Sequence, residues 1–327
     1  MGDGDFGVEA ARRRDWAALD DDLQDASTAG RADEGTVRAD DEPAADDTYT
    51  RWLPGLRDSC TAYDHAGHDF DACVVDWNPG GLAAETRPSA LFLKEKPGAP
   101  AIEPSDVQQY RLGDCALLAT AASLASTPAG RATLHDAIRE LKDPAGNVVG
   151  YSVRLYEVQG GRFGPKTFTP RSIPVSAFSP YVVGHARANG DGSHYEIWPL
   201  VLEKAYAHLR GGYDVVTKGE LARDAIEALT GAEARHTTAA GACDGQLAAD
   251  LRAGQAVVLS SKPGAQGNPY GIIGEHAYAV TGIEERAGQK VVLLYNPWGH
   301  DHPVPIPCSE LGRWFESVDA STAKGAL

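Results

Sequence analysis

The feature that most constrains this chain is an eleven-residue run, Cys115–Ala125, that is apolar except for Thr120 and Ser123. A helix without a polar face has to be enclosed by other parts of the fold, and the nearby Pro128 limits its C-terminal end. This is the longest largely apolar stretch of the chain, and it is well short of the roughly 18–20 residues needed to cross a bilayer. The run therefore predicts a helix at the centre of a globular core, and no transmembrane helix.

The spacing of apolar residues on either side of this run changes from helical to strand-like along the chain. Helical spacing predicts further helices over residues 130–141, 196–209 and 221–229. Alternating β-branched and aromatic residues predict a hairpin over residues 148–178 and strands over 256–260, 276–283 and 291–295. Helices followed by strands are typical of an α+β protein with two lobes. We expect a helical lobe over residues 105–212 and a β lobe over residues 213–327.

The negative charge of the chain is concentrated at its start. Of the formal net charge of −16, residues 1–50 contribute −10, from fifteen acidic residues and five arginines. This composition predicts a disordered acidic leader, and turn signals make residues 51–104 a loop-rich extension. No cluster of Lys and Arg offers a phosphate-binding surface, which argues against nucleic acid as a partner. The N-terminus lacks the apolar core of a secretory signal, so we expect a protein that is cytoplasmic or exported without a cleavable signal peptide.

Cys115, at the start of the predicted buried helix, is a candidate nucleophile. The unsatisfied N–H groups and the positive end of the helix dipole favour a thiolate at such a position. With a cation nearby, they can lower a cysteine pKa from about 8.5 to about 3.5–7.5. Gly113 permits close approach of a substrate backbone or an unusual turn. A lone cysteine at a helix start is more often structural than catalytic, so this interpretation depends on a partner.

Two further segments place polar side chains at the ends of predicted strands. His276 begins the strand over 276–283, and Asn296 follows the strand over 291–295 in the sequence Asn-Pro-Trp-Gly. Each of them alone is typical of an ordinary strand end or turn. Together with Cys115, however, they follow the order Cys, His, Asn, which is the order of nucleophile, base and orienting residue in papain-like enzymes.

Four motifs make the sequence resemble the calpain-like cysteine proteases of the papain-like superfamily. The family's Gln-Gly-x-Leu-Gly-Asp-Cys-Trp-Leu-Leu-Ala corresponds to residues 109–119, and its Gly-His-Ala-Tyr-x-Val-Thr-Gly corresponds to residues 275–282. Its Asn-Pro-Trp-Gly is intact at residues 296–299, and its helix Trp-x-x-Leu-Leu-Glu-Lys-Ala-Tyr-Ala resembles residues 198–207. The resemblance implies a two-lobe papain-like fold, and specifically a bacterial-type catalytic domain without the calcium-binding regulatory domains of animal calpains.

The resemblance also implies roles for single residues. Cys115 would attack a peptide carbonyl, His276 would take its proton, and Asn296 would orient the imidazole. Gln109 would supply a side-chain N–H to the oxyanion hole. Trp298 would shield the contact between Asn296 and His276 from water. The expected activity is that of a cysteine endopeptidase working through a covalent acyl-enzyme, as an effector, toxin or self-processing protease.

Three positions depart from the family motifs. Tyr110 replaces a glycine, Ala116 replaces the tryptophan after the nucleophile, and Glu275 replaces the glycine before the histidine. None of these changes removes a catalytic group, while Glu275 borders the expected substrate cleft and bears on specificity. After Gly299 the sequence lacks the acidic continuation that helps to hold calcium in animal calpains. We therefore expect no cofactor, and calcium dependence is not supported.

The four cysteines other than Cys115 are even in number. Cys60, Cys73, Cys243 and Cys308 could form two disulfides in an oxidising compartment or stay reduced inside a cell. Cys60 and Cys73 flank two histidines in the pattern Cys-x4-His-x2-His-x4-Cys, whose spacing is not that of a familiar zinc module. We expect no metal site there.

Two other functions use the same residues and stay open at this point. A non-catalytic module would hold a peptide in the cleft without cutting it, and an acyltransferase would pass the acyl group to an amine instead of water. The expected partners are a protein or peptide substrate and an inhibitor or immunity protein, with no membrane partner.

Overall fold

The computed structural model describes residues 89–94, 96–109, 112–160, 165–176, 187–188, 195–243, 245–265 and 267–322. The expected leader over 1–50, the extension as far as residue 88, and the pattern around Cys60 and Cys73 lie outside these ranges. In the described part of the chain, no helix is long and apolar enough to cross a membrane. The limits expected for the two lobes stay predictions.

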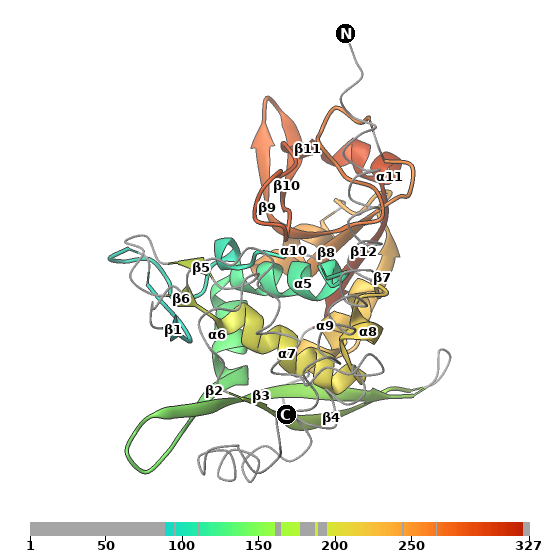
Figure 1. Cartoon of the computed structure of the whole chain (residues 1–327). Coiled ribbons are helices and arrows are strands. Elements are labelled where there is room, and N and C mark those ends of the chain that lie inside the picture. Colours follow the sequence, from blue (N-terminus) through green and yellow to red (C-terminus); the bar gives the residue numbers. More distant parts are fainter. Residues whose placement is uncertain are drawn as a thin grey trace, which may run out of the picture.

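The largest element of the fold is a six-stranded antiparallel sheet in the order β11-β10-β9-β8-β12-β7 (Figure 1). Its strands are β7 (Ala234–Thr238), β8 (Val257–Ser261), β9 (Ala277–Arg286), β10 (Gln289–Tyr295), β11 (Ile306–Pro307) and β12 (Phe315–Ser321). The structure confirms the predicted strands at β8, β9 and β10. β12 is not among the predicted strands, because its buried residues include Ser317, Asp319 and Ser321, which hide the usual alternation.

The helices are mainly those that the apolar spacing predicts. They are α5 (Cys115–Ala125), α6 (Pro128–Ala137), α7 (Trp198–Arg210), α8 (Tyr213–Val216), α9 (Ala222–Thr230), α10 (Gln246–Arg252) and α11 (Leu311–Trp314), with short 3-10 turns at η2 (Pro104–Asp106) and η3 (Cys308–Glu310). The helix predicted over 130–141 is wrong in its second half. Residues beyond Ala137 form β2 (Ile138–Lys142), because they pair with a neighbouring strand and tertiary pairing overrides helical spacing.

Two smaller sheets flank the helices. The sheet β2-β3-β4 contains β3 (Val148–Gln159) and β4 (Thr167–Ser176), which form the predicted antiparallel hairpin. In Figure 1 it lies on the side of α7 that is remote from the large sheet. The second small sheet joins three two-residue strands, β1 (Ser89–Ala90), β6 (Tyr195–Glu196) and β5 (Arg187–Ala188).

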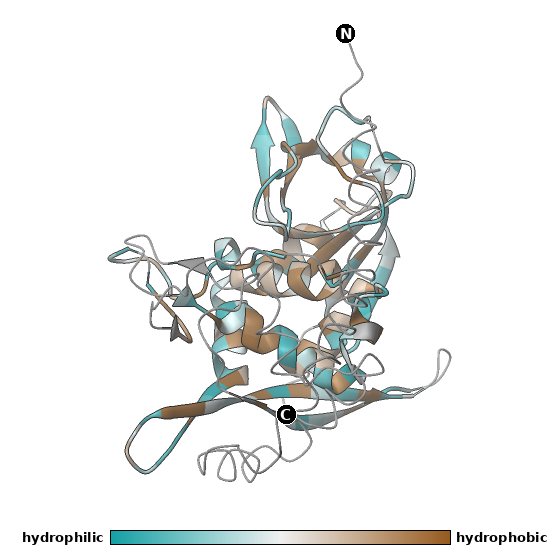
Figure 2. Cartoon of the chain, viewed as in Figure 1, coloured by the Kyte–Doolittle hydropathy of each residue, from teal (hydrophilic) through white to brown (hydrophobic). Residues whose placement is uncertain are grey.

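Helix α5 is enclosed as its sequence requires. Each residue from Ala116 to Ala125 is buried, and the helix packs against α6, α9, β8 and β9. Its two hydroxyl-bearing residues satisfy their polar groups inside the fold, since Thr120 donates to the Ala116 carbonyl (2.8 Å). The Ser123 hydroxyl accepts from Val257 N (2.7 Å) and donates to the Val280 carbonyl (3.3 Å). Ser123 thus ties the helix to both β8 and β9, and Figure 2 shows the apolar character of this central region.

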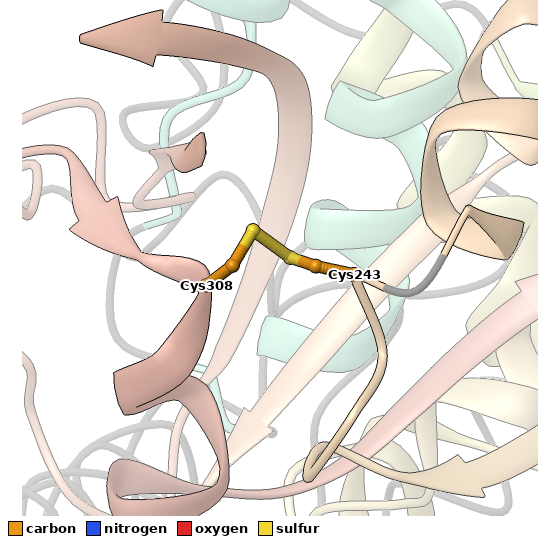
Figure 3. Close-up of a disulfide and its surroundings, with 2 residues drawn as sticks. All are labelled: Cys243 and Cys308. Carbon is orange, nitrogen blue, oxygen red and sulfur yellow. A yellow bond between two sulfur atoms is a disulfide. The ribbon is translucent and has the colours of Figure 1, made fainter. Parts of the chain in front are cut away.

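A disulfide lies in the β part of the molecule. It joins Cys243, in the turn before α10, to Cys308 at the start of η3, with 5.7 Å between the Cα atoms (Figure 3). Of the two expectations for these cysteines, the structure shows a disulfide between Cys243 and Cys308 and not two reduced thiols. Among the described residues Cys115 is the free cysteine.

Candidate active site

Cys115 occupies the first residue of α5, as the sequence predicts. The turn before it is closely packed, because a Cβ atom on Gly113 would lie 2.2 Å from the Thr217 carbonyl oxygen. Gly113 N also lies 3.3 Å from the Thr217 hydroxyl, to which it donates. The glycine is therefore required by the protein's own backbone, whereas the sequence had suggested close approach of a substrate or an unusual turn.

His276 and Asn296 are brought together by the β9–β10 hairpin. His276 directly precedes β9 and Asn296 directly follows β10, and the antiparallel register pairs Ala279 with Tyr295. Both residues consequently lie at the same end of the two strands, next to the N-terminal end of α5. His276 is 7% exposed and Asn296 is fully buried. Their side chains meet through His276 Nε2 and Asn296 Oδ1, which are 2.8 Å apart.

Hydrogen bonds to its neighbours fix the orientation of the Asn296 amide. Its Nδ2 donates to the Asp301 carbonyl (3.2 Å), and its Oδ1 accepts from Trp298 N (3.1 Å). Because an amide oxygen only accepts, the proton of the contact with His276 has to sit on Nε2. The neutral imidazole therefore keeps the lone pair on Nδ1, the nitrogen that faces away from the asparagine.

The imidazole is also held from its own backbone and by two aromatic rings. The Ser261 hydroxyl, at the end of β8, accepts from His276 N (2.9 Å) and lies 2.6 Å from the Ile273 carbonyl. Trp298 tilts over the imidazole with 4.6 Å between ring centroids, and Tyr278 meets it edge-on at 4.9 Å. The residue that sequence reasoning missed is Ser261. Its signal is weak, since only a polar residue ending the run Val-Val-Leu-Ser-Ser marks it.

The thiol of Cys115 lies against the residue that follows His276. Helix α5 packs on β9, and the Ala277 N–H donates a hydrogen bond to the sulfur. Burial raises the pKa of the Cys115 thiol to about 11; the Ala277 N–H opposes this rise, and the charges of Asp114 and Glu220 add to it. The helix start was expected to lower this pKa. Here burial and two carboxylates outweigh the helix dipole, so the thiol by itself keeps its proton at neutral pH.

Gln109 lies in the loop before α5, and this loop is hydrogen-bonded to the residue that follows Asn296. Its backbone N–H donates to the Pro297 carbonyl (2.6 Å), and its side chain is nearly buried. Its Nε2 donates one hydrogen to the Leu112 carbonyl (2.6 Å). A side-chain amide carries two N–H hydrogens, so one remains for a ligand. Of the three departures from the family motifs, Tyr110 lies outside the described residues and Ala116 is buried in α5.

Glu275, the third departure, adopts a left-handed backbone conformation with a φ of 54°. This conformation is routine for glycine and costs other residues roughly 1–2 kcal/mol. The residue is exposed and directly precedes His276. The backbone here has thus kept the shape of a glycine turn although the residue is a glutamate.

Metal ions in proteins are held by several ligating side chains grouped together. Within the described ranges, no three His, Cys, Asp or Glu side chains are grouped closely enough to hold a metal ion.

A central helix that begins with cysteine, packed on an antiparallel sheet that presents a paired histidine and asparagine, defines the papain-like class of cysteine protease. The sequence comparisons narrow this class. A model of the calpain family of cysteine proteases matches residues 83–314, so the chain belongs to that family.

Individual relatives agree with this assignment. The chain is 28% identical to calpain-9 of Rattus norvegicus over 290 residues, which cover 81% of this chain and 40% of the relative. It is 31% identical to the calpain-type cysteine protease DEK1 of Arabidopsis thaliana over 211 residues, 61% of this chain and 9% of the relative. Calpain-B of Drosophila melanogaster matches at 28% identity over 78% of this chain and 28% of its own length. The chain thus spans less than half the length of these relatives.

Proposed function

We propose that this chain is a cysteine endopeptidase that cuts peptide bonds through Cys115, His276 and Asn296. The observation that carries the proposal is the contact of 2.8 Å between His276 Nε2 and Asn296 Oδ1, in an amide whose orientation is fixed on both sides. Because Nε2 donates to Asn296, Nδ1 of His276 is left as the proton acceptor. The Cys115 thiol lies against Ala277, the residue that follows His276 at the start of β9.

The reaction runs in two halves. Nδ1 of His276 takes the thiol proton, and the sulfur of Cys115 attacks the carbonyl carbon of the scissile bond. The oxyanion is held by the free Nε2–H of Gln109 and the Cys115 backbone N–H. The imidazolium then gives its proton to the leaving amine, which leaves a thioester on Cys115. In the second half His276 takes a proton from water, and the water oxygen attacks the thioester carbon. The C–S bond then breaks, the acid is released, and the imidazolium returns its proton to the sulfur of Cys115.

The high pKa of the thiol makes the base indispensable. A thiol with a pKa of about 11 is almost entirely protonated at neutral pH, so attack requires proton transfer to His276. Trp298, over the imidazole, excludes water from the contact with Asn296 and strengthens it.

The test combines cleavage with labelling. The purified chain is incubated with casein, with and without calcium, beside the variant Cys115→Ala. We expect fragments from the wild-type chain alone, and a thiol-directed epoxide should stop cleavage and add its mass to the Cys115 peptide. A folded wild-type chain that takes up no label contradicts the proposal. Equal behaviour of both chains would favour peptide binding without cleavage, and crosslinking of an offered amine would favour acyl transfer.

The acidic leader is proposed as a substrate of the same chain. Residues 1–50 carry most of the net charge and precede the residues of the site, which suits a self-processing protease or an effector released from its leader. N-terminal sequencing of matured protein should show loss of part of 1–50, and Cys115→Ala should prevent this loss. The same N-terminus in both chains would contradict self-processing while leaving the endopeptidase proposal intact.

A further inference from the structure

A buried carboxyl group lies directly behind the nucleophile. Asp114 occupies the N-cap position of α5, but its side chain does not cap the helix, and the residue is fully buried. Within the described part of the chain, no N–H or hydroxyl group donates to either of its carboxylate oxygens. A carboxylate at an N-cap ordinarily turns toward the first helical N–H groups, so this one has been directed elsewhere.

The group that Asp114 meets is a second carboxyl. Glu203, from the middle of α7, is 2% exposed, and its side chain is hydrogen-bonded to that of Asp114. Two carboxyl groups can share a hydrogen bond only if one of them carries a proton. Burial together with the charge of Glu203 raises the pKa of Asp114 well above its usual range, so the proton of this contact belongs to Asp114.

Other ionisable groups surround the pair. Glu220, in the loop before α9, adds to the rise of the Asp114 pKa, and it has Arg210 at 3.4 Å as an ion-pair partner. Lys204 follows Glu203 on α7 and is 1% exposed. On α5 the facing group is Cys115 itself, whose pKa is raised in part by the charge of Asp114.

An aspartate and a glutamate in contact are a costly way to join two helices. A buried polar group that lacks full compensation costs about 1–3 kcal/mol, and a buried charge costs more. An amide pair would make the same hydrogen bonds without sharing a proton. Both acids also belong to the motifs that resemble the calpain family, at residues 109–119 and 198–207. Strongly perturbed carboxyl groups beside a reactive residue are typical of a functional role.

We propose that Asp114 and Glu203 are positioning residues that act as a proton-sharing pair and restrain the reactivity of the Cys115 thiol. The single negative charge of the pair disfavours a resting thiolate, so the sulfur keeps its proton until His276 removes it in the presence of substrate. Because the two carboxyl groups share a proton, they do not carry two negative charges, and the pKa of Cys115 is not raised further. The pair thus protects Cys115 from chance electrophiles and oxidants.

The experiment measures the rate of alkylation of Cys115 by iodoacetamide as a function of pH. Mass spectrometry of the Cys115 peptide excludes the other cysteines, and alkylation needs no turnover. The pH midpoint belongs to the coupled Cys115–His276 system. The double variant D114N/E203Q carries no charge, and its midpoint should fall by about one pH unit, the size expected for loss of one charge several ångströms away.

The single variants provide the sharper test. In D114N the charge stays on Glu203, so the midpoint should stay close to that of the wild type. In E203Q the charge settles on Asp114, directly beside Cys115 in the chain, so the midpoint should rise. The control is Asp319→Asn on β12, an equally buried aspartate whose pKa burial also raises, and it should leave the midpoint unchanged.

A folded double variant with the wild-type midpoint overturns the proposal. If the double variant does not fold, equal midpoints in D114N and E203Q overturn it, because the proposal places the remaining charge at different distances from the sulfur in these two variants. The inference extends the proposed function, but the two fail separately: normal alkylation with the expected order and no cleavage of casein would contradict the endopeptidase alone.

Discussion

The two halves of the site are built in opposite ways. On the sheet side, both polar atoms of the Asn296 side chain have partners, and His276 is held by a serine, a tyrosine and a tryptophan. On the helix side, Cys115 is half-buried, and desolvation, with a smaller contribution from the acidic groups Asp114 and Glu220, raises the pKa of its thiol. The proposed base is thus arranged in advance, while its raised pKa keeps the proposed nucleophile protonated. This contrast places control of the proposed reaction in the proton transfer between the halves.

The largest expected effect comes from removing the base. His276→Gln should lower kcat/KM by about 10⁴-fold, as loss of a triad member does in comparable enzymes. Alkylation of Cys115 should then need a higher pH than in the wild type, because the thiol is left with its own pKa of about 11. The iodoacetamide profile measures this directly. A profile unchanged by the substitution would show that the two halves are not coupled.

The next effect tests the helix side alone. Gln109→Ala removes the free amide hydrogen expected to hold the oxyanion, which costs about 10²–10³-fold in kcat. Alkylation of Cys115 forms no oxyanion, so its rate should not change. Measuring casein cleavage and alkylation on the same sample separates these outcomes. A parallel fall in both rates would instead indicate that Gln109 supports the loop before α5.

A smaller effect is expected from the hydrogen bond between Ser261 and the His276 backbone, on the sheet side. Ser261→Ala leaves the His276 backbone N–H without its acceptor inside the protein, which should lower the free energy of unfolding by about 1–3 kcal/mol. If Ser261 positions the imidazole, kcat should fall while KM stays unchanged. Urea denaturation and steady-state kinetics provide the two readouts.

The substitution Ser260→Ala, at the neighbouring residue, is the matched control for loss of the Ser261 hydroxyl. Successive residues of a strand point to opposite faces, so it should affect neither quantity comparably. Equal effects of the two substitutions would contradict a specific role for Ser261.

The smallest effect concerns the turn before the base. Glu275→Gly places a glycine where φ is 54° and should raise the free energy of unfolding by roughly 1 kcal/mol. Thermal denaturation checks the sign. Another exposed residue with a φ of 50°, Asp301, offers a comparison through Asp301→Gly. A destabilising Glu275→Gly would mean that the glutamate side chain contributes more than its backbone conformation costs.

Local patterns predicted much of this molecule. Helix α5 has the limits that the sequence suggests, and Cys115, His276 and Asn296 lie at element ends as expected, because capping, small-residue runs and strand alternation act within a few neighbours. What depends on distant partners was not predictable. β2 is a strand only because β3 lies beside it, and β12 inserts between β8 and β7 with buried polar side chains. The meeting of Asp114 with Glu203 likewise requires two helices far apart in the sequence to pack together.

The disulfide between Cys243 and Cys308 gives the protein a second kind of sensitivity. Cys308 directly follows β11, where the chain returns from the loop that carries Asn296 and Trp298. A crosslink that closes a segment of this length stabilises a fold by about 4 kcal/mol, and it survives only where thiol reductants are weak. The sulfur of Cys115, in contrast, must stay reduced if it is to act as the proposed nucleophile. The two sulfur sites therefore place opposite demands on the redox potential of the protein's surroundings.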